Sequence, residues 1–201
     1  MKKTLLLLTA LFFVTACTST PSVTASNKVE NDTKETVELK TALNEYTQAT
    51  MDNDVTKLIS FVYPKVFTVV AKEKMTEVLQ AAYNSPNAPT VKNVKHLNIE
   101  PIEKYDEGKF AIITSSMTTL IKSPRPGDER FEAYMLSMLN KGLHNGDNVD
   151  FDKENHLFTV NHQSKTVAIN ENSGWKFAGI TQAKKYAEKG ILPQAIVNKI
   201  Q

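Results

Sequence analysis

FAIITSSMTTLI (residues 110–121) is the stretch that decides the fold class, because β-branched and other apolar residues dominate it and no charged residue interrupts it. That composition is typical of a strand. The turn signal Asp106-Glu107-Gly108 precedes it, so residues 91–103 and 110–121 are expected to be extended segments joined by a hairpin turn. Three more strands are expected near residues 156–162, 165–171 and 175–181, separated by Gln163-Ser164 and Asn172-Ser173-Gly174. The second half of the chain therefore predicts an antiparallel sheet.

Apolar residues recur at helical spacing in the first half. This spacing predicts helices over residues 35–50, 55–62 and about 72–83, with Asp54 as the cap of the second and Tyr63-Pro64 at its end. A helix inserted between strands follows from the spacing of Phe131, Tyr134, Met135, Met138, Leu139 and Leu143, and a short final helix is expected over 193–200. Helices followed by strands predict an α+β domain, in which helices pack on a curved, mostly antiparallel sheet.

The N-terminus has the three parts of a secretory signal. Met1-Lys2-Lys3 is positively charged, residues 4–14 are mainly apolar, and small residues lead to Cys17, the single cysteine of the chain. The apolar run is too short to span a bilayer stably. We therefore divide the chain into a signal peptide (1–16), a lipidated cysteine with a flexible tether (17–34) and a single α+β domain (35–201).

Val14-Thr15-Ala16-Cys17 resembles the lipobox of bacterial lipoproteins. The resemblance implies cleavage before Cys17, a diacylglyceryl thioether on its sulfur and a further fatty acyl chain, such as palmitate, on the new N-terminus. Two or three acyl chains would anchor the protein durably, whereas one gives only reversible binding. Thr18 in place of an aspartate implies an outer-membrane location facing the periplasm. A plain secretory signal, in which Cys17 is a bystander, is the open alternative.

Composition limits the classes of partner. Removal of residues 1–16 leaves 185 of the 201 residues, and loss of Lys2 and Lys3 leaves 22 Lys and Arg against 22 Asp and Glu. A near-neutral chain argues against bulk electrostatic binding to nucleic acid or to an anionic membrane. With Cys17 lipidated, no disulfide can form within the chain, so packing must supply the stability.

The order of elements resembles the nuclear-transport-factor-2-like fold, and the likeness is closest to uncharacterised bacterial envelope proteins of that superfamily. It is carried by the segment from Leu43 to Tyr63-Pro64, by the closing Trp175-Lys176-Phe177 and by Leu192-Pro193. The resemblance implies a cone that encloses a pocket. Some relatives are isomerases, cyclases or dehydratases that use such a pocket for catalysis. Others are ligand-binding or assembly modules. A homodimer formed through the sheet face is a further implication of this analogy.

Four residues are candidates for the lining of that pocket: Tyr46, Tyr63, Met117 and Trp175. An isomerase of this class needs a carboxylate base opposite a phenol or a protonated acid. Residues 110–121 contain no acid, so neither Tyr46 nor Tyr63 has an obvious carboxylate partner on a strand. We therefore assign no catalytic residue and expect no cofactor.

No metal site is expected. In one unbroken strand His156 and His162 would lie about 20 Å apart, too far to share an ion. The acidic segment 147–152 lacks the central glycine and the terminal glutamate spacing of a calcium loop. The helix around Met135 and Met138 is either ordinary core or an adaptable lid or docking edge.

These observations predict a membrane-anchored, periplasm-facing module for binding a small apolar ligand or an envelope protein. The alternative is a small cofactor-free enzyme of the isomerase, cyclase or dehydratase type, acting on an apolar substrate in the cone.

Overall fold

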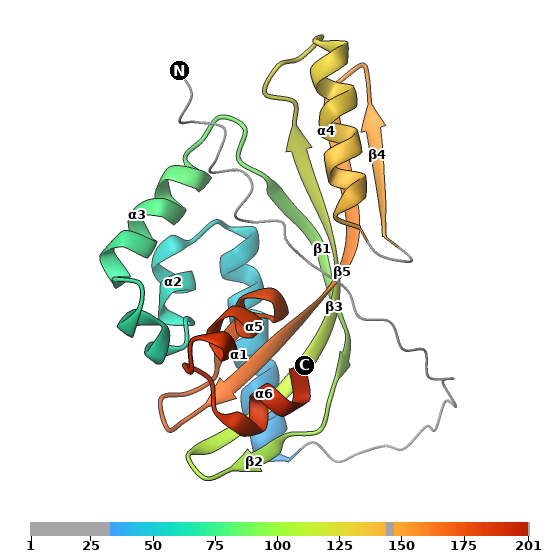
Figure 1. Ribbon diagram of the computed structural model, residues 1–201. Helices are drawn as coiled ribbons and strands as arrows, with labels where there is room; N and C mark the ends of the chain where they lie inside the picture. Colours follow the sequence, from blue (N-terminus) through green and yellow to red (C-terminus); the bar gives the residue numbers. More distant parts are fainter. Residues whose placement is uncertain (1–32, 144–146, 201) are drawn as a thin grey trace, which may run out of the picture.

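Two long antiparallel strands form the axis of the structure, a computed structural model that describes residues 33–143 and 147–200 (Figure 1). Strand β3 (Gly108–Lys122) and strand β5 (Leu157–Asn170) pair from Lys109↔Asn170 to Lys122↔Leu157. The remaining strands flank this pair: β1 (Thr90–Ile99) and β2 (Glu103–Tyr105) beside β3, and β4 (Asn148–Asp152) and β6 (Lys176–Gly179) beside β5. The described strands pair with one another antiparallel throughout, and an isolated parallel bridge joins Val62 to Phe177 of β6.

The helices pack on this strongly twisted sheet, so the predicted α+β class is confirmed (Figure 1). Their bounds are α1 (Lys34–Met51), α2 (Val55–Ser60), the 3-10 helix η2 (Pro64–Thr68), α3 (Lys72–Tyr83), α4 (Glu129–Lys141), α5 (Ile180–Glu188) and α6 (Gln194–Ile200). Local chemistry sets several of the ends. The side chains of Thr33, Asp54 and Asp128 accept hydrogen bonds from backbone N–H groups in the first turns of α1, α2 and α4.

The expected strand boundaries need correction at two places. The segments 156–162 and 165–171 fall in one strand, β5, because Gln163 and Ser164 pair with Ser116 and Ser115 across an unbroken ladder. The strand expected over 175–181 is shorter, because β6 ends at Gly179 and α5, whose Ala183 is fully buried, begins at Ile180. The acidic residues 148–152 form strand β4.

The molecule has two regions, which we call the body and the arm. The body contains α1, α2, η2, α3, α5, α6 and the sheet beneath them. Successive residues of a strand point to opposite faces. Phe110 and Ile112 join a buried cluster with α5 and α6, while Ala111 and Ile113 join a second cluster with α1. Helices therefore cover both faces of this end of the sheet.

The arm consists of α4, β4 and the ends of β3 and β5, residues 119–122 and 157–161, and projects beyond the body (Figure 1). Its core is small. Only Ile121, Phe158 and Val160 of its cluster are fully buried. The other members are partly buried: Met135, Leu136, Leu139, Leu143, Val149 and Phe151.

Candidate functional site

Side chains fill the space between α1 and the sheet. Tyr46 stacks on Phe177 with ring centroids 4.8 Å apart and meets the edge of Phe61 at 5.8 Å. Trp175, which is 4% exposed, belongs to the same buried cluster. Burial, with a smaller contribution from Tyr83, raises the pKa of Tyr46 to about 12. Tyr46 and Trp175 are thus brought together, as packed core residues.

Tyr63 lies on the opposite face of the sheet, in the cluster covered by α5 and α6. Its ring is buried, and its hydroxyl donates a 2.7 Å hydrogen bond to Oε1 of Glu171. Because it sits in a different cluster from Tyr46 and Trp175, the three aromatic candidates do not line one common cavity.

A second phenol and a lysine meet the same carboxylate oxygen. Tyr105 donates to Oε1 of Glu171 at 2.7 Å, and Nζ of Lys65 lies 3.2 Å from it. Lys65 also donates to Glu107. We call these five residues, Tyr63, Lys65, Tyr105, Glu107 and Glu171, the Glu171 cluster. They come from η2, β2, the β2–β3 turn and the residue after β5, so the cluster ties four chain segments together.

Electrostatics keeps this carboxylate charged. Burial alone would raise the pKa of Glu171, but hydrogen bonds from Tyr105, Tyr63 and Lys65 together outweigh it and hold the pKa below its ordinary value. Burial and the bond to Glu171 raise the pKa of Tyr63 to about 12 and raise that of Tyr105 further. Glu171 is therefore a poor proton donor. The hydroxyl groups of both Tyr63 and Tyr105 already donate their hydrogen bond to its carboxylate.

Sequence reasoning found no carboxylate partner for Tyr63, and the structure supplies one. The apolar strand 110–121 contains no acid, whereas Glu171 follows the neighbouring strand β5 and its side chain is only 16% exposed. The available signal was an acid two residues after an apolar strand segment, Val167 to Ile169, where a partly buried charge needs a partner.

Met117, the fourth candidate, lies on β3 away from the other three and faces His162 across the ladder. It lines a shallow, open hollow of about 580 Å³ together with Asn93, Lys95, Ser116, Thr118, Asp147, Asn161, His162 and Gln163. Nδ1 of His162 is buried without a hydrogen-bond partner, and burial lowers the pKa of this imidazole. Every lining residue except Met117 has a polar or charged side chain, which does not suit a purely apolar substrate.

His156 and His96 hold structural contacts. His156 precedes β5 in a left-handed turn (φ 50°), where its Nδ1 lies 2.9 Å from the buried carboxylate of Glu132. His96 bridges Ser115 at 2.9 Å and Thr47 at 3.2 Å. Within residues 33–143 and 147–200, no group of three or more His, Cys, Asp and Glu side chains is arranged to hold a metal ion.

Cys17 lies outside the described residues. In the part of the chain that the structure describes, none of the helices combines the length and the apolar character needed to cross a bilayer.

Comparisons with known proteins add little to this geometry. No protein-family model and no curated protein matches the chain. Among solved structures, the chain is similar to a proposed dehydratase of the nuclear-transport-factor-2-like family from Streptomyces avermitilis, with 12% identity and a TM-score of 0.40 over 72% of this chain and 91% of that one. A similarity this low carries no argument about activity, so the fold class rests on the strands and helices themselves.

Proposed function

We propose that the chain is a lipid-anchored envelope protein that binds a protein partner through its outer surface. The observation that carries this proposal is the filled interior: where a cone pocket would lie between α1 and the sheet, Tyr46, Phe61 and Phe177 are in ring contact. An apolar substrate has no room there without displacing core side chains.

The position of the anchor fits this role. The chain enters α1 at the end of the body near β2, where Glu35 on α1 pairs with Lys109 on β3 at 2.9 Å. The arm lies at the other end of β3, about 40 Å away along a strand that rises about 3.3 Å per residue. A lipid on Cys17 would attach the protein through the chain that enters this end, so the arm is the part farthest from the point of attachment.

The arm also presents side chains typical of protein interfaces. Tyr134 is 60% exposed and Met138 is 40% exposed, one turn apart on α4. Tyrosine and methionine are enriched in protein contacts because both provide large contact areas. Exposure of both on one helix favours recognition by the arm over ordinary core packing for these two positions.

The enzyme alternative draws on the convergence of Glu171 with two phenols. An isomerase would need a phenol or a neutral acid directed at the substrate. Here both phenols donate to a carboxylate that stays charged, so the Glu171 cluster acts as a polar bridge between segments.

Native mass spectrometry of the detergent-solubilised protein from its own membrane tests the proposal. We expect the lipidated chain without a small-molecule adduct. An adduct that survives gentle ionisation and is lost on denaturation would contradict it and support the enzyme or ligand-binding alternative. The anchor has a separate control: Cys17→Ser should move the protein from the membrane fraction to the soluble fraction.

A further inference from the structure

Strand β4 is an edge of the sheet. It pairs with β5 from Asn148↔Asn161 to Asp152↔Leu157, and no described strand pairs with its other edge. An unpaired edge presents backbone N–H and C=O groups to any extended chain that reaches it.

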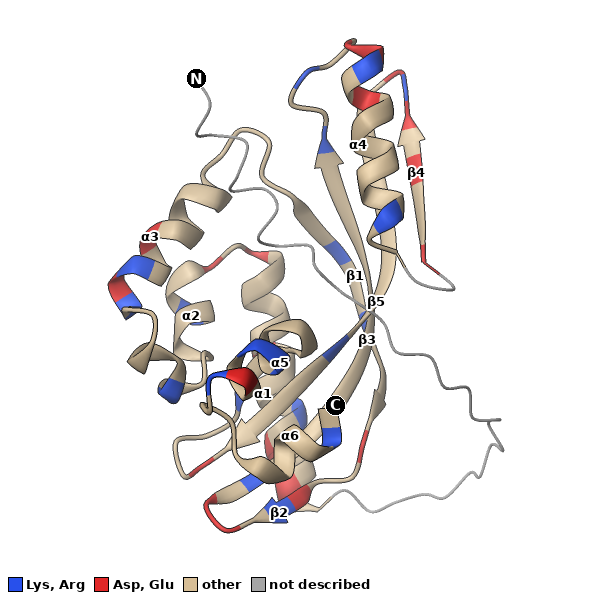
Figure 2. Ribbon diagram, in the orientation of Figure 1, with Lys and Arg blue, Asp and Glu red and all other residues tan. Residues whose placement is uncertain are grey.

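The side chains of β4 alternate in character. Asn148, Asp150 and Asp152 are exposed, while Val149 and Phe151 turn toward the core beneath α4. Asp150 accepts a hydrogen bond from Asn148, and Asp152 accepts bonds from Glu154 and Asn155 in the turn that follows. Among the described residues, no cation lies within ion-pair distance of Asp150 or Asp152, although Lys153 follows in the turn. Figure 2 shows the resulting acidic stripe along β4.

The core beside this edge is incompletely covered. Val149 and Phe151 stay partly exposed, although Phe151 stacks on the fully buried Phe158 at 4.4 Å. A strand added next to β4 would place every second side chain over these two residues and under α4. The intervening side chains would lie beside Asp150 and Asp152.

We propose that β4 is the docking edge for an extended, basic segment of a protein partner, in which Lys or Arg alternates with apolar residues. The inference deepens the proposed function and rests on it. Charge selects this occupant: basic side chains would neutralise Asp150 and Asp152, and the main-chain ladder would supply the affinity. A second copy of the chain is disfavoured, because antiparallel pairing of two β4 strands would bring the acidic residues together.

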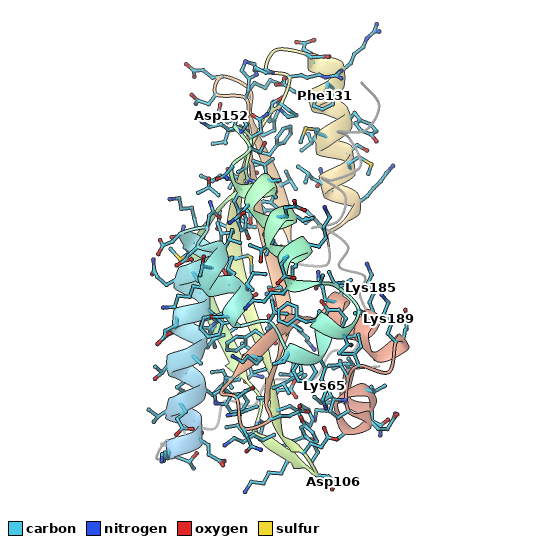
Figure 3. All side chains as sticks on the ribbon, turned by 90° about the vertical axis from the view of Figure 1, so that its left-hand side faces the viewer. Lys65, Asp106, Phe131, Asp152, Lys185 and Lys189 are labelled. Carbon is cyan, nitrogen blue, oxygen red and sulfur yellow. The ribbon has the colours of Figure 1, made fainter. Side chains whose placement is uncertain are left out.

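The test uses the whole purified protein and two short synthetic peptides, one alternating lysine with valine and one alternating glutamate with valine. Fluorescence anisotropy should detect binding of the lysine peptide only, weakening as ionic strength rises from low to physiological. Asp150→Lys should weaken that binding about tenfold or more. Asp106→Lys is the matched control, because Asp106 is an acid at the opposite end of the molecule from Asp152 (Figure 3).

Hydrogen exchange at β4 provides the second readout. The lysine peptide should slow the exchange of β4 amides and leave those around Asp106 unchanged. Where Asp150→Lys fails to fold by circular dichroism, Asp150→Asn replaces it, with the same direction expected. Equal affinity for the two peptides, equal affinity of the Asp150 and Asp106 variants, or unchanged exchange at β4 would each overturn the inference. Those outcomes leave the proposed function standing, because that function requires contact through the outer surface and not through β4 in particular.

Discussion

The two ends of the β3–β5 pair are built from the same strands but are covered differently. In the body, helices bury both faces, and Phe110, Ile113, Val167 and Ile169 are almost fully inaccessible. In the arm, α4 covers one face, while Leu120 and Thr159 on the other stay partly exposed. Hydrophobic stabilisation follows the apolar area removed from water, so the body should hold most of the stability. The arm keeps surface available for contact.

Two matched substitutions test whether the body holds most of the stability, and they carry the largest expected change in the free energy of unfolding. Phe177→Ala removes a ring that touches Tyr46 and Phe61, and we expect a loss of about 3–5 kcal/mol in the free energy of unfolding. Phe158→Ala removes a fully buried ring from the arm. We expect it to open the arm locally and to leave the urea midpoint of the body nearly unchanged, as followed by Trp175 fluorescence. Equal midpoint shifts would remove the distinction between the two regions.

The pH dependence of the free energy of unfolding gives a second test of what stabilises the body, through the Glu171 cluster. The pKa of Glu171 is lowered in the folded state, so its contribution is fully present above the unfolded value of 4.5 and is lost as pH falls through the folded value. Glu171→Gln should cost about 1–3 kcal/mol at neutral pH and flatten the stability profile below pH 4.5. Urea denaturation at a series of pH values measures both effects. If the stability of Glu171→Gln falls below pH 4.5 as steeply as that of the unsubstituted protein, Glu171 is not held charged by its neighbours.

Helix caps give a smaller, paired comparison. Asp128 caps α4 in the arm through Phe131 N–H at 3.1 Å, and Asp54 caps α2 in the body through Lys57 N–H at 2.9 Å. Each change to Ala should remove about 1 kcal/mol of local stability. In Asp128→Ala, hydrogen exchange should become faster at the amides of α4 and stay unchanged in the helices of the body. Propagation of that change into α1 would show that the arm and the body unfold as one unit.

The smallest effect is expected at the exposed face of α4. Tyr134→Ala should change the free energy of unfolding by no more than about 0.5 kcal/mol, because the ring contributes little to the core. Thermal denaturation measures it. A loss above about 2 kcal/mol would show that Tyr134 is a packing residue and not part of an interaction surface.

Local sequence predicted most of the architecture, since α1, α3 and α4 follow helical repeats and the strand 110–121 follows its composition. The prediction from local sequence failed at Gln163-Ser164, where two polar residues indicated a turn between strands. The opposing strand continues through that position, and its Ser115 and Ser116 pair with them without a break. Only the three-dimensional structure could show this.

The candidate site was less predictable for the same reason. Tyr63 and Glu171 are 108 positions apart, and Tyr105 joins them only because β2 folds back on β3. Tyr46 and Trp175, both proposed as pocket lining, lie in one buried cluster, and Phe61 and Phe177 fill the space beside Tyr46. No spacing rule fixes how rings from three separate elements pack together.

Site-specific photo-cross-linking in the native envelope tests the central claim, that contact is made by the arm and not by an interior pocket. A photoreactive residue replaces Tyr134, Asn148 or, as the control at the β2 end, Asp106. We predict a discrete protein adduct from positions 134 and 148 and none from position 106. Adducts from position 106 alone, with positions 134 and 148 silent, would contradict the account.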